Sequence, residues 1–124
     1  MLYAILIHQP LGATDHLTPQ EQESMNAQHR ALQKETQAQG TFVAATQLME
    51  AYAATSVRRR GDRISIEEGP FAETKEMFIG LYLLDCETLE EALEFSKKIP
   101  HADFGTVEVR PVAYHEDTAG PFAQ

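Results

Sequence analysis

The chain has 124 residues, a formal net charge of −9 and 43% apolar residues, which suits one globular domain with a core of its own. The negative balance argues against nonspecific binding of nucleic acid, because such binding depends on cations that neutralise phosphates. No apolar run is long enough for a transmembrane helix, the first residues lack the features of a signal peptide, and the single cysteine excludes an internal disulfide. We therefore expect a cytoplasmic protein that does not associate with membranes.

The first elements are a strand and a long helix. Residues 2–9, LYAILIHQ, predict a strand that is apolar on both faces. The helix should begin at a capping box formed by Thr18 and Glu21 and end at Gly40. Helical spacing places His29 on the same side as the few large apolar residues of this helix, so its ring should face the core or a cleft.

The middle of the chain predicts four strands. Residues 41–49 form the first of them. Residues 55–60 and 63–67 flank Gly61-Asp62, a two-residue turn that suits a tight β-hairpin. Residues 77–85 then form a strand that, like the first one, is apolar on both faces.

The last part of the chain predicts a second helix and a closing strand. The helix should be capped by Thr88 and end before Pro100. Its apolar stripe is expected to consist of Leu89, Ala92, Leu93, Ser96 and Ile99. A strand over 106–114 completes a single domain over residues 1–114, and residues 115–124 form a polar tail that is expected to be loosely held.

The predicted order of elements defines a fold class. Without the small hairpin the order is βαββαβ, the ferredoxin-like α+β pattern with an antiparallel sheet. Right-handed crossovers place both helices on one face of that sheet. Because strands 2–9 and 77–85 are apolar on both faces, the other face would expose a large apolar patch in a monomer. We therefore expect a homodimer that buries this second face.

Several motifs together resemble the YCII-related proteins, in particular the subgroup named after a DGPF motif. They are EGPFAETKE (68–76), the opening MLYAILIH, ATSVRRRGDR (54–63) and IPHADFGTVEVRPV (99–112). The subgroup usually has aspartate where this chain has Glu68. The resemblance implies a dimeric α/β barrel, with a small cleft at the sheet–helix edge near the dimer interface. It also implies an enzyme with a histidine on the first helix and an aspartate near the last strand, or a regulatory context beside extracytoplasmic-function sigma factors.

His29 is the candidate for chemistry, because a histidine titrates near neutral pH and can transfer protons. It occupies the position of the family's histidine, and Asp103 is the candidate carboxylate that would orient its ring at about 3 Å. The alternative is a packed histidine that a neighbouring side chain satisfies.

Further candidates for a cleft lie around the EGPFAETK motif and on the last strand. They are Glu68, Phe71, Glu73, Lys75 and Arg110. Phe71 either closes an edge of the core or forms a cleft wall. For Glu68, Glu73 and Lys75 the alternatives are capping of backbone groups and ligand binding. An arginine near a cleft would suit a small anionic ligand, and Phe71 an aromatic one.

Other chemistry is not expected. The histidines have no spacing typical of metal sites, and no motif for a nucleotide cofactor is present, so we expect no metal and no cofactor. Acidic neighbours make Cys86 a poor nucleophile. Two functions remain: a hydrolase- or lyase-like small-molecule enzyme that uses His29 as acid or base, and a non-enzymatic ligand-binding or regulatory module.

Overall fold

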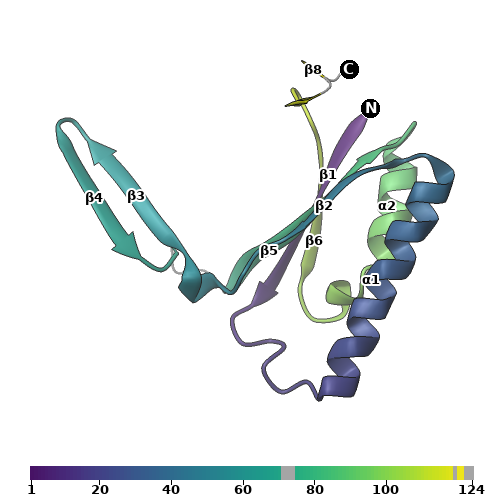
Figure 1. The fold of residues 1–124 in the computed structure, drawn as a ribbon, viewed down its shortest axis with the longest axis horizontal. Helices are drawn as coiled ribbons and strands as arrows, with labels where there is room; N and C mark the ends of the chain where they lie inside the picture. The colour runs from purple at the N-terminus through teal and green to yellow at the C-terminus, as the bar shows by residue number, and fades with distance from the viewer. Residues whose placement is uncertain (71–74, 119, 122–124) are drawn as a thin grey trace.

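A computed structural model describes residues 1–70, 75–118 and 120–121, and Figure 1 shows the arrangement of the elements. The strands are β1 (Leu2–Pro10), β2 (Phe42–Gln47), β3 (Thr55–Arg60), β4 (Arg63–Glu68), β5 (Glu76–Asp85), β6 (Thr106–Pro111), β7 (Glu116–Asp117) and β8 (Gly120–Pro121). The helices are α1 (Pro19–Gln39) and α2 (Leu89–Lys97), and two short 3-10 helices are η1 (Ala51–Ala53) and η2 (Pro100–Asp103).

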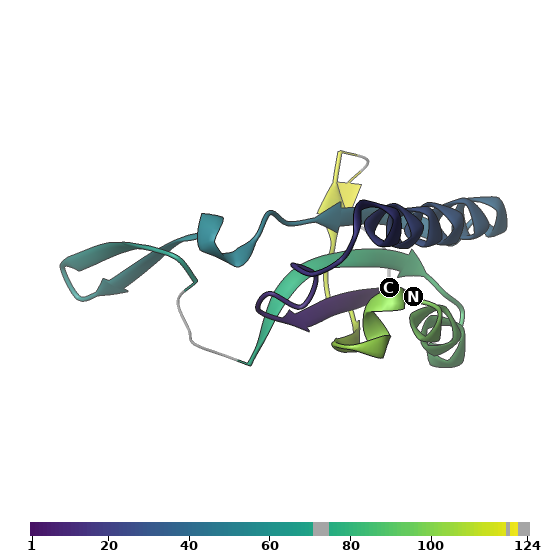
Figure 2. The same cartoon turned by 90° about the horizontal axis from the view of Figure 1, so that it is seen from below.

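The main sheet has four antiparallel strands in the order β2-β5-β1-β6. This is the ferredoxin-like order, and the predicted α+β fold class is therefore confirmed. Both helices lie on the same side of the sheet, and the β3–β4 hairpin extends from the molecule on the other side (Figures 1 and 2). Within the described part of the chain, the sheet consequently has one face covered by helices and one open face.

Helix α1 has the ends that its sequence predicts. The Glu21 N–H donates to the Thr18 hydroxyl at 3.1 Å, and the Thr18 N–H donates to the Glu21 carboxylate at 3.1 Å, which completes the capping box. At the other end Gly40 adopts a left-handed conformation with φ 76°, a conformation that glycine adopts without strain. These local signals fix the length of α1 and hence where His29 lies along it.

The core lies between the helices and the covered face of the sheet. Its buried members are Tyr3, Ile5, Ile7, Leu32, Tyr82, Leu84, Cys86, Ala92, Phe95 and Ile99. The predicted stripe of α2 needs a correction: Ala92, Ser96 and Ile99 are buried as expected, but Leu89 and Leu93 are exposed and Phe95 is buried. The interior positions therefore follow an i, i+3, i+4, i+7 spacing from Ala92, which rotates Leu89 and Leu93 toward solvent.

A β-bulge changes the predicted faces of β5. Ile7 pairs with Gly80 and His8 pairs with Phe78, so Ile79 is the extra residue on β5. Strict alternation would place Phe78 on the same face as Tyr82, whereas Phe78 is 40% exposed and Ile79 packs against the core. The bulge therefore exchanges the faces of these two residues.

The β3–β4 hairpin has the predicted strands and turn, with Gly61 at φ 62°. We call this hairpin the arm.

The closing strand is shorter than expected, because β6 ends at Pro111. Within the tail, β7 and β8 pair with each other as a small antiparallel ladder, and the expectation that the tail is loosely held stays a prediction. Phe71 and Glu73 of the EGPFAETK motif lie outside the described residues.

Candidate functional site

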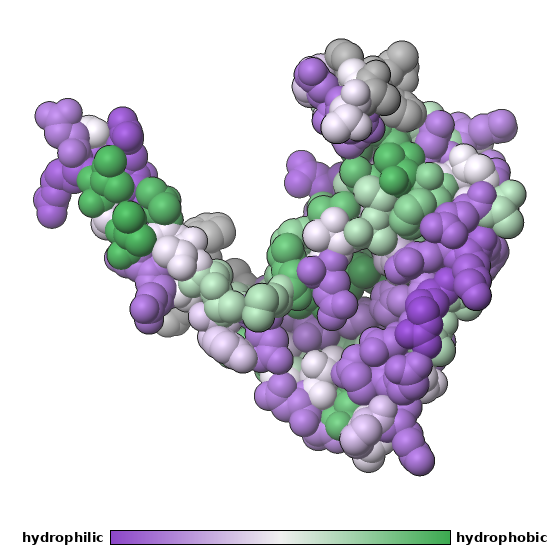
Figure 3. Space-filling model, in the orientation of Figure 1, coloured by the Kyte–Doolittle hydropathy of each residue, from purple (hydrophilic) through white to green (hydrophobic). Residues whose placement is uncertain are grey.

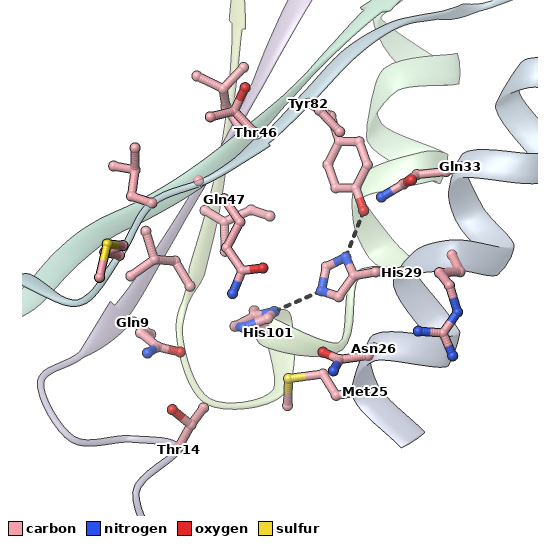
Figure 4. Close-up of a pocket in the computed structure, with 18 of the residues that line it drawn as sticks. Gln9, Thr14, Met25, Asn26, His29, Gln33, Thr46, Gln47, Tyr82 and His101 are labelled. Atoms are coloured by element: carbon pink, nitrogen blue, oxygen red, sulfur yellow. Dashed lines mark hydrogen bonds between the residues drawn. The ribbon is translucent and has the colours of Figure 1, made fainter. Parts of the chain in front are cut away.

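A cavity of about 690 Å³ lies between α1 and the covered face of the sheet. Residues of β1, α1, β2, β5 and η2 line it, and segments that are far apart in the sequence meet there (Figure 4). The volume lies within the range of small-molecule sites in proteins. His29 is one of the lining residues, so the predicted orientation of this side chain toward a cleft agrees with the structure.

The His29 ring lies between two other polar side chains. Its Nδ1 is 2.6 Å from the Tyr82 hydroxyl of β5, and its Nε2 is 3.2 Å from Nδ1 of His101 on η2 (Figure 4). The rings are also in contact, with centroids 5.9 Å apart for His29 and Tyr82 and 5.1 Å apart for the two histidines. The three side chains form a continuous hydrogen-bonded row, which we call the Tyr82–His29–His101 row.

A close approach of two backbones positions His101. The N–H groups of Phe104 and Gly105 both donate to the His101 carbonyl, which closes the turn after η2. Gly105 lies against β1 so closely that a Cβ at this position would be 2.1 Å from the His8 carbonyl oxygen. Glycine is required here because any side chain would push η2 away from β1. His101 itself is 9% exposed, so its ring is held within the packed structure.

All three groups of the row are uncharged at neutral pH. Burial lowers the pKa of His29 below its usual value. Burial, and in second place the neighbouring His29, lower the pKa of His101 to about 4. Burial raises the pKa of the Tyr82 phenol, although a hydrogen bond from Gln33 acts in the opposite direction. The row is therefore a set of neutral donors and acceptors, in which a proton can move along existing hydrogen bonds.

The hydrogen-bond partners favour one set of tautomers for the row. The Tyr82 oxygen interacts with the Gln33 side chain, and its own proton then points to Nδ1 of His29. His29 consequently carries its proton on Nε2 and donates it to Nδ1 of His101. This leaves the proton of His101 on its Nε2. The row thus runs in one direction from the phenol to His101.

The structure places four of the other predicted site residues outside this cavity, while Phe71 and Glu73 lie outside the described residues. Asp103 is exposed at the end of η2 and has no direct hydrogen bond to His29 in the described part of the chain. His29 instead contacts His101, which lies two residues before Asp103 and takes the place expected for Asp103. Glu68, Lys75 and Arg110 are exposed and are not among the residues that line the cavity. Their proposed roles in binding remain predictions.

Sequence reasoning missed Tyr82 and His101 as members of the site. Tyr82 lies on a strand that was expected to be apolar on both faces; a tyrosine is usual in such a strand, and its hydroxyl gives no signal in the sequence. His101 lies in the IPHADFG segment that contributed to the family resemblance, in which Asp103 was the candidate. A buried tyrosine needs a hydrogen-bond partner, and that requirement was the one available hint that Tyr82 meets a polar residue.

The described residues contain no group of three or more histidine, cysteine or acidic side chains placed to bind one metal ion. None of the helices within those residues combines the length and apolar character needed to cross a lipid bilayer. Burial, and then the nearby Glu91 and Asp85, raise the pKa of the Cys86 thiol, which disfavours its reactive thiolate form.

The fold and the cavity define a small ferredoxin-like α+β protein with a histidine-containing pocket between its first helix and its sheet. The chain belongs to the YCII-related family, whose family model, described as the YCII-related domain, matches residues 1–116. It is also 34% identical over 118 residues to "Uncharacterized protein R00369" of Rhizobium meliloti (strain 1021), with 94% of this chain and 95% of that protein covered. The predicted family is therefore confirmed.

Proposed function

We propose that the chain is a small-molecule enzyme of hydrolase or lyase type, in which His29 transfers a proton to or from a ligand in the cavity. The observation that carries this proposal is the position of His29 in a cavity between the Tyr82 hydroxyl and His101. A general acid or base needs a pKa near the working pH and a hydrogen-bond route for the proton. The row supplies the route, and burial keeps the His29 imidazole neutral and thus ready to accept a proton.

Both ring nitrogens of His29 have partners, so a ligand that exchanges a proton with His29 must replace one of them. The contact of Nε2 with His101 is 3.2 Å long, whereas that of Nδ1 with Tyr82 is 2.6 Å. The longer contact is the weaker one and is more readily replaced. In this proposal Tyr82 keeps the His29 ring oriented, and the ligand meets the ring at Nε2. Nε2 donates its proton when His29 acts as an acid, and it accepts a proton when His29 acts as a base and carries its own proton on Nδ1, toward the Tyr82 oxygen.

Hydrolysis of p-nitrophenyl acetate, a generic activated ester, tests the proposal. The wild-type chain should hydrolyse the ester faster than buffer, and His29→Asn should lower kcat/KM by about 100-fold or more. His16→Asn is the matched control, because His16 is an exposed histidine on the β1–α1 loop and does not line the cavity. A wild-type rate equal to that of His29→Asn, or an equal loss in both variants, would refute a role of His29 in ester hydrolysis.

A non-enzymatic role is the second candidate, and one observation favours it. Within the described residues no carboxylate hydrogen-bonds to His29 or to His101, although a carboxylate is a common orienting partner of a catalytic histidine. A cavity with a neutral histidine pair could serve ligand binding alone, in a regulatory module that acts beside an extracytoplasmic-function sigma factor. Ligand binding that is unaffected by His29→Asn, together with no turnover, would favour this role.

We further propose that the chain acts as a cytoplasmic homodimer with the cavity near the interface. The support is the open face of the sheet, where Leu6 and Leu83 are half-buried and no helix of the described residues covers them. A second copy that packs there would remove this apolar surface from water. Sedimentation at micromolar concentration should give twice the chain mass of 13.9 kDa, and a species of the single mass would contradict the proposal.

A further inference from the structure

We propose that the cavity binds an uncharged ligand that places a hydrogen-bond donor against the side chain of Gln9. This inference rests on the proposed function in that it names the class of ligand for the same cavity. It starts from the polar side chains of the cavity wall, which are unusually rich in carboxamides. The carboxamides are those of Gln9, Gln22, Asn26, Gln33 and Gln47. Each can donate and accept hydrogen bonds, and none carries a charge.

The charges around the cavity offer nothing to an anion. Two residues of the described lining carry a formal charge at neutral pH, Arg30 and Glu50. The Arg30 guanidinium is already paired with the Glu23 carboxylate at 2.6 Å. An anion that entered would lose its hydration without gaining an unpaired cation, which is unfavourable. A neutral ligand has no such penalty.

Gln9 supplies the observation that points to a donor on the ligand. Its Oε1 is buried and has no hydrogen-bond partner among the residues that the structure describes, and the side chain lines the cavity (Figure 4). A buried acceptor without a partner is destabilising, and such groups in native proteins usually have a role. An N–H or O–H group of a ligand would satisfy this oxygen. Apolar lining residues such as Ile7, Phe42 and Ile79 would meanwhile contact an apolar or aromatic body.

Two probes of nearly equal shape separate the neutral class from the anionic one. Benzamide offers an N–H donor and an aromatic ring, and benzoate has the same ring with a negative charge. At about ten times its dissociation constant, benzamide should raise the melting temperature by about 5 °C, whereas benzoate at the same concentration should leave it unchanged. Gln9→Met keeps the length of the side chain and removes the acceptor, so it should abolish most of the benzamide shift. Gln20→Met is the matched control, because Gln20 is exposed on α1 and does not line the cavity.

Stronger stabilisation by benzoate than by benzamide would overturn the proposal. So would a full benzamide shift in Gln9→Met, or no shift of the wild type by benzamide, acetamide or phenol. These measurements report binding without turnover. If the expected thermal shifts are not seen, the acid–base role of His29 is still tested by the ester-hydrolysis assay. If ester hydrolysis is not seen, the class of ligand is still tested by the thermal shifts.

A second, independent inference concerns the arm: we propose that it docks on a second copy of this chain. One face of the arm is apolar and exposed, with exposed fractions of 66% for Val57, 55% for Ile64 and 68% for Ile66. Val57 pairs directly with Ile66, and Ile64 follows on the same face of β4. The space-filling view shows apolar residues on the arm and on the sheet across a hollow between them (Figure 3). An isolated two-stranded hairpin with such a face gains stability when a partner covers it.

Charge complementarity selects a second copy as that partner. The whole arm carries a net charge of +1, because Asp62, Glu67 and Glu68 offset three of its four arginines, and the other residues carry −10 to give the total of −9. The four arginines all lie within residues 58–63, around the turn of the arm, and this basic end on an acidic chain is attracted to another acidic chain of the same kind. In a two-fold dimer each copy offers one arm and accepts one, so the contact is made twice. The inference rests on the proposed homodimer and assigns a part of its interface.

The arm can be tested with two substitutions on opposite faces of β4. Ile66→Asp places a charge on the apolar face and should convert the wild-type dimer to a monomer in sedimentation or light scattering at about 10 µM, where specific dimers are well populated. Ser65→Asp, on the opposite face of the same strand, should remain dimeric. Raising the salt concentration should weaken the wild-type dimer, because the attraction of the arginines is screened.

A wild-type dimer that Ile66→Asp leaves intact would overturn the role of the arm and would leave the open sheet face as the interface. A monomeric wild type would overturn both the arm and the homodimer. A monomeric wild type that binds double-stranded DNA through the arm arginines would assign the arm to nucleic acid instead. An unchanged circular-dichroism spectrum of Ile66→Asp shows that the loss of the dimer is not a loss of the fold.

Discussion

Mild acid should destabilise this protein through the buried His101. In the folded chain burial and the adjacent His29 lower the pKa of His101 from 6.5 to about 4. As the pH falls through 6.5, His101 of the unfolded chain takes up a proton, whereas His101 of the folded chain stays neutral until the pH approaches 4. The unfolded state therefore binds more protons in this window, and the free energy of unfolding falls as the pH falls. Above pH 6.5 His101 is neutral in both states, so this loss of stability is absent.

The size of the effect follows from the pKa difference. Lowering the pKa of His101 from 6.5 to about 4 on folding reduces the free energy of unfolding by about 3 kcal/mol at a pH where both states are protonated. About 2 kcal/mol of this should be lost between pH 7 and pH 5, a large part of the stability of a small domain. Burial also lowers the pKa of His29, so His29 contributes in the same direction over the same window.

Urea denaturation at several pH values measures this effect. The variant His101→Asn lacks the titrating group, so its free energy of unfolding should fall less steeply than that of the wild type between pH 7 and pH 5. The difference between the two proteins should change by about 2 kcal/mol over this range. His101→Gln provides a second variant if asparagine prevents folding, and NMR titration of the His101 ring reports its pKa directly. Parallel pH profiles of wild type and variants, or a ring that titrates near 6.5, would refute the reasoning.

Three further substitutions test the packing and the row. Tyr82→Phe keeps the ring that packs against Phe95 and removes the hydroxyl at 2.6 Å from His29, so it should lower kcat of any His29-dependent reaction more than it raises KM; an unchanged kcat would contradict an orienting role. Leu84→Ala, at a position 1% exposed, should reduce the free energy of unfolding by about 2–5 kcal/mol in urea denaturation, and a loss below 1 kcal/mol would show that the core relaxes there. Gly105→Ala should cost about 1–3 kcal/mol, because its Cβ would be 2.1 Å from the His8 carbonyl oxygen, and the His29 ring signals in NMR should shift as η2 moves; unchanged stability and ring signals would contradict the close approach.

The sequence predicted the local elements well, because their signals act over a few residues. The capping box at Thr18 and the glycine at position 40 set both ends of α1. The Gly61-Asp62 turn set the register of the arm. Alternation in β1 correctly put Tyr3, Ile5 and Ile7 on one face, and the structure shows that this face meets the core. Two predictions failed where packing overrides a regular pattern: the bulge that turns Phe78 outward, and the rotation of α2 that buries Phe95.

The candidate site could be predicted in part. Helical spacing correctly turned His29 toward a cleft, and the family resemblance pointed to the same residue. The partner of His29 was expected to be Asp103, but the structure brings His101 to this place. Residues 101 and 103 are on one turn of η2, and which of them meets α1 depends on how Gly105 packs against β1. No spacing in the sequence encodes that contact.

The sequence by itself determined the elements, their order and the residue on α1 that faces the cavity, because backbone hydrogen bonds, caps and apolar periodicity are local. The tertiary structure alone decided that Tyr82, His29 and His101 form one row. His29 is 53 residues from Tyr82 and 72 residues from His101 along the chain. Their meeting depends on the strand order β2-β5-β1-β6 and on the position of both helices on one face of that sheet. The pKa values of the row depend on burial, and burial exists only once these elements have packed together.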